Sequence, residues 1–500
     1  MDPLFEVTFH HIRATPGTAA ATLYRELRGA ILDGRVRPGT RLPPTRRATR
    51  FYGVSRNTAI EVYERLASEG FLVARRGSGT YVATPVPEPA KPPPRDDPAR
   101  HTGRVNPFWL SRDTTDAIGF WHEGMRAGPA ADAIDFRPGL IDARLFPHDL
   151  FRQSMARQLR RLERRPASFE SAQGNPGHLG LREAIAGHIA LTRAVPCRPA
   201  DILVTSGAQQ AFDLLARVLV RPGRSVVAVE DPGYPPMRVA FAAAGAKLVP
   251  VPVDAGGLRV DRLPRTVDII CVCPSHQFPL GVSMPAERRQ ALLAAARTRG
   301  AVVVEDDYDG EYRYEGSPLE ALRVQAAADV VFYVGTFSKC MLPSLRLGFL
   351  IAPPWAMPSL VAAKHCSDWH CSIPVQLGVA SFIADGHLAR HVRRMRTVYG
   401  ERRQALTDAV RGTLGAWLEP VESYYGMHLT AVGDGPTDFD ALADAAQARG
   451  VRIHSLRRYH ARKPARSGLV FGYGATDVAK AREGVRVLHA LLASRRTARS

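Results

Sequence analysis

The sequence is poor in cysteine, in acidic residues and in long apolar runs, and each shortage excludes a class of protein. Six cysteines lie at irregular spacings in 500 residues, which excludes the disulfide framework of a small secreted protein. No apolar run approaches the ~18 residues of a membrane-spanning helix, and the N-terminus lacks a basic segment followed by an apolar one. We therefore expect a soluble, cytoplasmic protein.

Potential metal ligands are also sparse. Two His-Cys pairs, His365-Cys366 and His370-Cys371, lie close together, but no second ligand pair stands near them in the sequence. Buried thiols are the ordinary state of such cysteines, with zinc as the alternative. We expect no metal site.

The shortage of acidic residues makes the chain strongly basic. There are 48 Asp+Glu against 67 Lys+Arg, a net charge of +19. Such a charge indicates an anionic partner, although an arginine-rich proteome biases composition in the same direction. The apolar fraction of 45% is that of a globular protein, and the length predicts roughly three folding units of about 150 residues each.

Residues 1–84 carry the pattern of a helix-turn-helix followed by a β-hairpin wing. Helices are expected over residues 18–33, 45–52 and 55–69, with Gly53 in the tight turn and Ser55 as an N-cap. Two short β runs, residues 72–74 and 80–83, flank a basic turn. This part holds 13 arginines, no lysine and 7 acidic residues, a net charge of +6, which favours double-stranded DNA as the partner.

The start of the third helix is expected to meet base edges in the major groove, as in other helix-turn-helix proteins. The candidates there are Ser55, Arg56, Asn57 and Thr58. Arg56 can pair with guanine and Asn57 with adenine. Contacts that hold phosphate without reading sequence are expected from Arg46, Arg75, Arg76, Gly77, Ser78 and Thr80. A winged helix that docks on another protein is the alternative.

A proline-rich linker is expected over residues 85–134. Residues 85–98 contain seven prolines in fourteen positions, which favours extended polyproline-like backbone. Two aromatic pairs, Phe108-Trp109 and Phe120-Trp121, interrupt the polar composition. We expect them to dock on one of the domains.

Residues 135–500 alternate apolar runs with helical segments, which predicts an open, mainly parallel α/β sheet. Most runs are Val/Ile-rich on both faces, as in strands buried between helices. The runs cover residues 202–205, 225–229, 247–253, 268–273, 301–304, 330–334 and 345–351. A large part over about 135–385 and a small α/β part over about 386–500 are expected.

Polar clusters fall at the ends of these runs, where ligands bind in such sheets. The sequence Ser206-Gly207-Ala208 opens a helix and suits a phosphate. Tyr234 can stack on a flat ring. Asp306 can face a protonated pyridine nitrogen and Tyr308 a phenolate oxygen, with a metal site on the acidic run Glu305-Asp306-Asp307 as the alternative.

The segment GTFSK, followed by an arginine, gives the cluster its chemistry. Lys339 ends a strand-like run and can form a Schiff base with a phosphorylated aldehyde. The hydroxyls of Thr336 and Ser338 and the guanidinium of Arg346 can hold the phosphate. A lysine that follows a strand is more often a solvated surface residue. The assignment of Lys339 to a Schiff base therefore depends on the other clusters.

Two resemblances follow from these motifs. RLPPTRR, VSRNT and RRGSGT resemble a GntR-type winged helix-turn-helix, and SGAQQAFDLLARVL, VEDPGYP, PSHQFPLG, EDDYDGEYRY and GTFSK resemble fold-type I, pyridoxal 5′-phosphate (PLP)-dependent aminotransferases. Together they resemble the MocR family of regulators. The resemblance implies a multidomain chain, with a winged helix-turn-helix (α+β) head, an α/β aminotransferase-like domain with a small C-terminal α/β subdomain, PLP on Lys339, and a homodimer that exchanges heads.

Two departures from the aminotransferase pattern bear on activity. Phe278 replaces the Asn of the Asn-Pro-x-Gly loop, so the phenolate contact is expected from His276 or Gln277, or is missing. Val470 stands where a substrate-binding arginine is normal, and Arg466, four residues earlier, is expected to be solvated. Turnover of amino acids should therefore be poor.

The resemblance to the MocR family, together with the missing arginine, implies a DNA-binding regulator that senses PLP and controls vitamin B6 metabolism. Three alternatives stay open: an active aminotransferase with a DNA-binding head, a regulator that senses an amino compound through the cofactor, and a regulator without cofactor.

Overall fold

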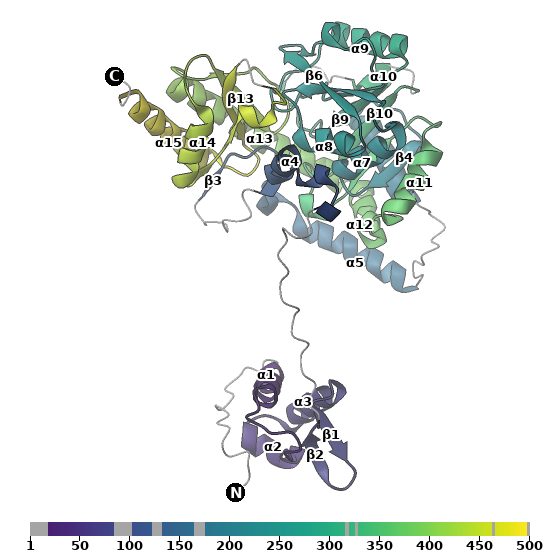
Figure 1. Cartoon of the computed structure of the whole chain (residues 1–500), viewed down its shortest axis with the longest axis vertical. Helices are drawn as coiled ribbons and strands as arrows, with labels where there is room; N and C mark the ends of the chain where they lie inside the picture. Colours follow the sequence, from purple (N-terminus) through teal and green to yellow (C-terminus); the bar gives the residue numbers. More distant parts are fainter. Residues whose placement is uncertain are drawn as a thin grey trace. The chain divides into compact units, whose positions relative to one another are not determined.

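The computed structural model describes residues 19–84, 103–122, 133–164, 176–315, 320–325, 329–462 and 466–497. The chain divides into two compact units, Met1–Arg104 and Val105–Ser500 (Figure 1). Within the described ranges, no helix combines the length and apolar character needed to cross a bilayer. The proline-rich stretch at residues 85–98 lies outside the described residues.

The first unit is a winged helix-turn-helix. Its elements are α1 (Ala19–Leu32), α2 (Thr45–Tyr52), α3 (Arg56–Ser68), β1 (Leu72–Arg75) and β2 (Gly79–Val82). One apolar cluster unites the three helices with the hairpin, and Leu23, Leu27 and Leu66 are fully buried in it. Gly53 ends α2 with a φ of 70°, a conformation that favours glycine. The antiparallel hairpin pairs Leu72 with Val82.

The second unit is built on an eight-stranded sheet of order β4-β11-β10-β9-β8-β5-β6-β7. The strands are β4 (Ile202–Thr205), β5 (Val226–Asp231), β6 (Lys247–Asp254), β7 (Gly257–Leu258), β8 (Ile269–Val272), β9 (Val302–Asp307), β10 (Val331–Thr336) and β11 (Gly348–Ile351). Strands β6, β5, β8, β9 and β10 are parallel, whereas β11 runs antiparallel between β10 and β4. The carboxyl ends of β9 and β10 therefore meet at one edge.

Helices cover both faces of this sheet. They are α5 (His148–Arg164), α6 (Leu179–Arg193), α7 (Ala208–Leu219), α8 (Pro235–Ala243), α9 (Ala286–Arg299), α10 (Leu322–Gln325), α11 (Met357–Asp368) and α12 (Ile373–Ala384). The neighbouring β10 residues Tyr333 and Val334 belong to different apolar clusters, Tyr333 with α6 and α12 and Val334 with α7 and α8. Both faces are buried because successive side chains of a strand point to opposite sides.

A smaller part follows the long helix α13 (His387–Leu414). Its antiparallel sheet has the order β12-β13-β16-β15. Its further elements are β12 (Glu419–Pro420), β13 (His428–Gly433), α14 (Phe439–Ala448), β14 (Val451–Arg452), β15 (His454–Ser455), η8 (Leu456–Tyr459), β16 (Ser467–Gly472) and α15 (Val478–Thr497). The distant strand β3 (Ile134–Asp135) pairs with β14, so this part is assembled from both ends of the second unit.

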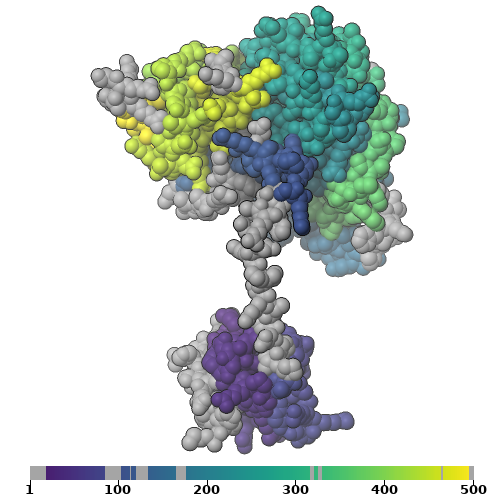
Figure 2. Space-filling model, viewed as in Figure 1, coloured from purple at the N-terminus to yellow at the C-terminus, as the bar shows by residue number. Residues whose placement is uncertain are grey.

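A short folded segment lies inside the stretch that the sequence analysis assigns to the linker. It consists of η3 (Pro107–Leu110) and α4 (Arg112–His122). The Thr114 hydroxyl donates to the Phe108 carbonyl at 3.0 Å, and Ala117 is buried. The segment, in dark blue, lies where the large and small parts meet (Figures 1 and 2), and it shares a cavity wall with α8 and α14. The side chains of Phe120 and Trp121 lie outside the described residues.

Candidate cofactor site and nucleic-acid interface

A cavity of about 520 Å³ opens beyond the carboxyl ends of β9 and β10. It brings together residues from seven separate stretches of the sequence. Of the predicted site residues, those that line it are Ala208, Tyr234, Asp306, Tyr308, Thr336, Ser338, Lys339 and Arg346. The sheet topology explains this convergence, because parallel strands deliver the residues that follow them to the same edge.

Lys339 is a half-buried residue in the lining of this cavity. Its Nζ donates to the Gly139 carbonyl at 2.7 Å. Burial lowers the pKa of Lys339 to about 8, against the opposing effects of Asp309 and Asp306. A lower pKa leaves more of the lysine as the neutral amine near neutral pH, and the neutral amine is the form that attacks a carbonyl.

Asp306 presents an unpaired oxygen at the same site. Its Oδ1 is buried and has no hydrogen-bond partner among the described residues, while Oδ2 accepts a long contact of 3.8 Å from the Cys273 thiol. Burial, and then repulsion from Asp307, raises the pKa of Asp306 to about 7. A buried, unpaired carboxylate is costly, so a protonated ring nitrogen in the cavity would fit this residue well.

The two neighbouring carboxylates have partners of their own. Glu305 accepts from the backbone N–H groups of Leu322 and Arg323. Asp307 accepts from Arg193 Nε and from the Tyr333 hydroxyl, both at 2.5 Å. The acidic run therefore divides into two satisfied groups and one that faces the cavity. Within the described chain, none of these three belongs to a group with metal-ligand spacing.

Three loops form a cradle at the other end of the cavity. Arg346 has a left-handed backbone with a φ of 46°, and its Nη2 donates to the Ser206 carbonyl at 2.9 Å. Gly207 caps α7 with a φ of 83°, and a Cβ there would lie 3.1 Å from Arg346 Nη2. The Thr336 and Ser338 hydroxyls are 3.0 Å apart. A guanidinium, two hydroxyls and a helix N-terminus are donors that suit a phosphate.

Some predicted residues are placed beside the cavity rather than in its wall. The Ser206 hydroxyl contacts Asp368 at 3.4 Å and Cys371 at 3.3 Å. His276 stands behind Tyr308, whose hydroxyl is 2.8 Å from its Nδ1. The side-chain amide of Gln277 donates to the carbonyls of Pro232 and Phe278 at 2.8 Å. Of the two residues considered for the missing Asn, His276 is therefore the one that contacts Tyr308.

The position normally held by a substrate-binding arginine is apolar. Val470 is buried in β16, opposite Thr430 of β13. Arg466 lies near the surface and pairs with Asp434 at 3.1 Å. Among the described residues that line the cavity, the cations are Lys339 and Arg346.

Sequence reasoning missed one wall of the cavity. Trp109, Ala117 and Ile118 of the η3–α4 segment line it, as do Gly139 and Leu140. The signal in the sequence for this wall was the aromatic pair Phe108-Trp109. The two rings pack edge to face with centroids 5.1 Å apart. A pair of aromatic residues in a polar stretch predicts docking, but it does not say where.

The DNA-facing candidates divide into capping and exposed residues. The Thr58 N–H donates to Ser55 Oγ at 3.1 Å, and the two hydroxyls are 2.8 Å apart. Ser55 and Thr58 thus close the first turn of α3, whereas Arg56 and Asn57 are exposed there. Arg46 is exposed on α2.

The wing offers a second basic surface. The Arg75 guanidinium lies 4.9 Å from the centroid of the Tyr81 ring, and Ser78 Oγ is 2.6 Å from the Tyr81 hydroxyl. Gly77 turns the hairpin with a φ of 73°, and Thr80 pairs with Ala74. Arg76 is exposed at the turn, in a position suited to phosphate.

Ser55→Ala is expected to loosen α3 by about 1 kcal/mol, because the N-cap acceptor is lost. Ser55→Asn should restore most of that stability, since asparagine is an equally good cap. Hydrogen exchange of the α3 amides in the full-length protein measures the change. If alanine and serine give the same protection, the cap is unimportant.

Comparisons with known proteins agree with both units. The model for aminotransferase class I and II matches residues 150–467, and the model for bacterial regulatory proteins of the gntR family matches residues 19–82. The chain is 36% identical over 471 residues to the probable rhizopine catabolism regulatory protein MocR of Rhizobium meliloti, which covers 93% of this chain and 92% of that protein.

Further relatives cover the same span. The chain is 31% identical to the HTH-type pyridoxine biosynthesis transcriptional regulator PdxR of Corynebacterium glutamicum, over 92% of this chain and 93% of that protein. An archaeal alanine:glyoxylate aminotransferase superposes with a TM-score of 0.71 at 25% identity, over 78% of this chain and 98% of that one. The predicted fold class is confirmed, and aminotransferases of this class typically bind PLP.

Proposed function

The chain belongs to the MocR family of GntR-type transcriptional regulators, and from this premise we propose that it binds PLP at Lys339 and that the bound state controls its binding to DNA. The observation that carries the proposal is that one cavity is lined by a half-buried lysine and by a carboxylate whose buried oxygen has no partner among the described residues. Similarity to PdxR supports PLP itself as the effector, with vitamin B6 metabolism as the target.

Each part of the cavity has a role in this proposal. Lys339 forms the Schiff base, Asp306 pairs with the ring nitrogen and Tyr234 stacks on the ring. Tyr308, backed by His276, donates to the phenolate oxygen. The phosphate is held by Ser206, Gly207, Ala208, Thr336, Ser338 and Arg346. The bound group supplies an aldehyde carbon and an electron-poor ring, and the protein supplies position and charge.

The walls of the cavity favour sensing over turnover. Once Arg346 holds phosphate and Lys339 holds the aldehyde, no further cation remains among the described lining residues for the carboxylate of an amino acid. Val470 offers no charge in place of the usual arginine. An active aminotransferase is the second candidate, because Lys339 and Asp306 are both in place, and a regulator that senses an amino compound is the third.

The η3–α4 segment supplies a route from the cavity towards the linker. Trp109 and Ile118 line the cavity, and the segment begins close to the boundary between the two units at residue 104. A ligand shifts an equilibrium only if it binds two states with different affinities. We propose that filling the cavity changes how this segment packs, in a homodimer that exchanges heads.

The test is footprinting of the protein on its own upstream DNA with and without PLP, beside an absorbance assay with a panel of amino acids. A footprint that changes with PLP, together with a cofactor band that amino acids leave unchanged, is the expected result. Rapid conversion of that band with release of keto acid would favour the enzyme. A change of footprint that requires one amino compound would favour the third candidate.

A further inference from the structure

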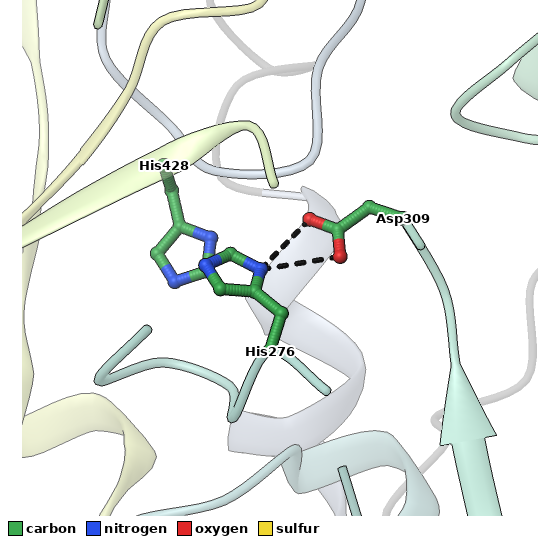
Figure 3. A group of neighbouring side chains, drawn as sticks. All are labelled: His276, Asp309 and His428. Atoms are coloured by element: carbon green, nitrogen blue, oxygen red, sulfur yellow. Dashed lines mark hydrogen bonds and ion pairs between the residues drawn. The ribbon is translucent and has the colours of Figure 1, made fainter. Parts of the chain in front are cut away.

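A buried polar cluster next to the cavity contains a carboxylate to which the proposed function gives no role. His276, Asp309 and His428 come from three different segments, and their ligand atoms lie within 4.8 Å of one another (Figure 3). All three side chains are almost fully buried. The cluster borders Tyr308, whose hydroxyl is 2.8 Å from His276 Nδ1.

The spacing suits a metal, but the hydrogen bonds already present explain the cluster without one. His276 Nδ1 lies 3.0 and 3.1 Å from the two oxygens of Asp309. His428 Nε2 lies 2.7 Å from the Pro279 carbonyl, and a carbonyl can only accept, so Nε2 carries a proton. A metal ion would have to displace the contact between His276 and Asp309.

The position of one proton follows from these contacts. Burial lowers the pKa of His276 to about 3, so the ring is neutral and carries a single N–H. Nδ1 lies at near-equal distances from both oxygens of Asp309, a geometry that suits an Nδ1–H donating to the ionised carboxylate. Nε2 is buried and has no partner among the described residues, and an unpaired acceptor is tolerated better there than an unpaired N–H.

Burial raises the pKa of the Asp309 carboxyl to about 8, against the opposing effects of His428 and Lys339, so the ionised carboxylate that accepts from Nδ1 predominates above that pH. The backbone also holds the pair in place. Gly426 has a φ of 78°, and a Cβ there would collide with both His276 and Asp309. The Gly426 carbonyl accepts from the Tyr473 hydroxyl at 2.7 Å, which fixes the glycine against the two side chains.

We propose that Asp309 is a positioning residue that holds the ring proton of His276 on Nδ1, so that the Tyr308 hydroxyl donates its hydrogen into the cofactor cavity. Tyr308 shares the Nδ1–H as an acceptor, and its own hydrogen is then available for the phenolate oxygen. With the proton on Nε2, Nδ1 would become an acceptor and draw the Tyr308 hydrogen away from the cavity. Which nitrogen is protonated is set by the hydrogen bond made to the ring.

This inference rests on PLP binding in the proposed function, and Asp309→Asn in the full-length protein tests it. The amide has the same shape but can donate to Nδ1, which favours the other tautomer. We expect PLP affinity to fall about tenfold, the loss typical of one hydrogen bond to a charged group, and the bound cofactor's absorbance to shift as it does in Tyr308→Phe. The exposed Asp434→Asn serves as the control and should match wild type.

A double-mutant cycle separates positioning from general disruption. In the Tyr308→Phe background, Asp309→Asn should change affinity and absorbance little further. Additive effects of the two changes would overturn the proposal, as would wild-type behaviour of Asp309→Asn. If wild type itself shows no cofactor band, the proposed function fails instead.

His276→Asn keeps the test decisive if Asp309→Asn does not fold. An asparagine amide places an N–H near the position of Nδ1 and has no tautomer to choose. PLP affinity within about threefold of wild type is expected, since the donor to Tyr308 is retained. Behaviour like that of Tyr308→Phe would contradict the proposal.

Discussion

Lys339→Ala is expected to abolish covalent attachment of PLP. Borohydride reduction of the wild-type protein saturated with PLP should place a label on the peptide that contains Lys339, and the variant should carry none. The assignment is simple because the sequence has only six lysines. The physical reason is that this amine is withdrawn from solvent, which lowers its pKa to about 8 and increases the share of its neutral form, at the site where a ring can be held.

Lys247→Ala is the matched control, because Lys247 is exposed at the start of β6. Its labelling should equal that of wild type. If Lys339→Ala is still labelled, on another lysine, then that lysine and not Lys339 is the attachment site. An unlabelled wild-type protein would leave a DNA-binding head joined to a domain that does not use the cofactor.

Arg56→Ala and Arg76→Ala are expected to impair DNA binding in different ways. Arg56 is exposed in the first turn of α3, where a guanidinium can reach a guanine edge. Its loss should cost about 1–3 kcal/mol on the preferred sequence and relax base preference. Arg76, exposed at the turn of the wing, should contribute similarly on every sequence, and its loss should reduce the salt slope by about one unit.

Binding isotherms on the preferred and on scrambled DNA, at several salt concentrations, measure both changes. Arg217→Ala is a control outside the DNA-binding unit, since Arg217 pairs with Asp213 on α7. Equal losses from Arg56→Ala and Arg76→Ala on all sequences would contradict the division between reading and positioning. An undiminished affinity in both would point to the docking module instead.

The position of the polar residues at strand ends was predictable because the pattern of the sheet is local. Apolar runs rich in valine and isoleucine predict buried strands, and Asp306 and Lys339 each follow such a run in the sequence. The separate environments of the three acidic residues were not predictable. Asp307 accepts a hydrogen bond from Arg193, 114 residues earlier in the chain. A partner at that distance in the sequence cannot be predicted from a local pattern.

The η3–α4 segment is a part of the fold that the sequence did not predict. The segment follows a proline-rich stretch, so the expectation of an extended linker followed from the backbone preference of proline. A role for Trp109 and Ile118 can be seen only in the folded structure, where both residues line the cavity. The contacts of His276 with Asp309 and Tyr308 were equally hidden, because they join residues 33 and 32 positions apart in the chain.

The hydrogen bond from Lys339 to the Gly139 carbonyl has a chemical consequence under the proposed function. An ammonium group has three hydrogens to give, whereas the nitrogen of a protonated Schiff base has one. Covalent attachment of the cofactor would therefore leave at most one hydrogen on this nitrogen for the Gly139 carbonyl, in the stretch that joins α4 to α5. Where that hydrogen turned to the cofactor instead, the carbonyl would need water or another donor, and the change would fall on the main chain between the cavity and the DNA-binding unit.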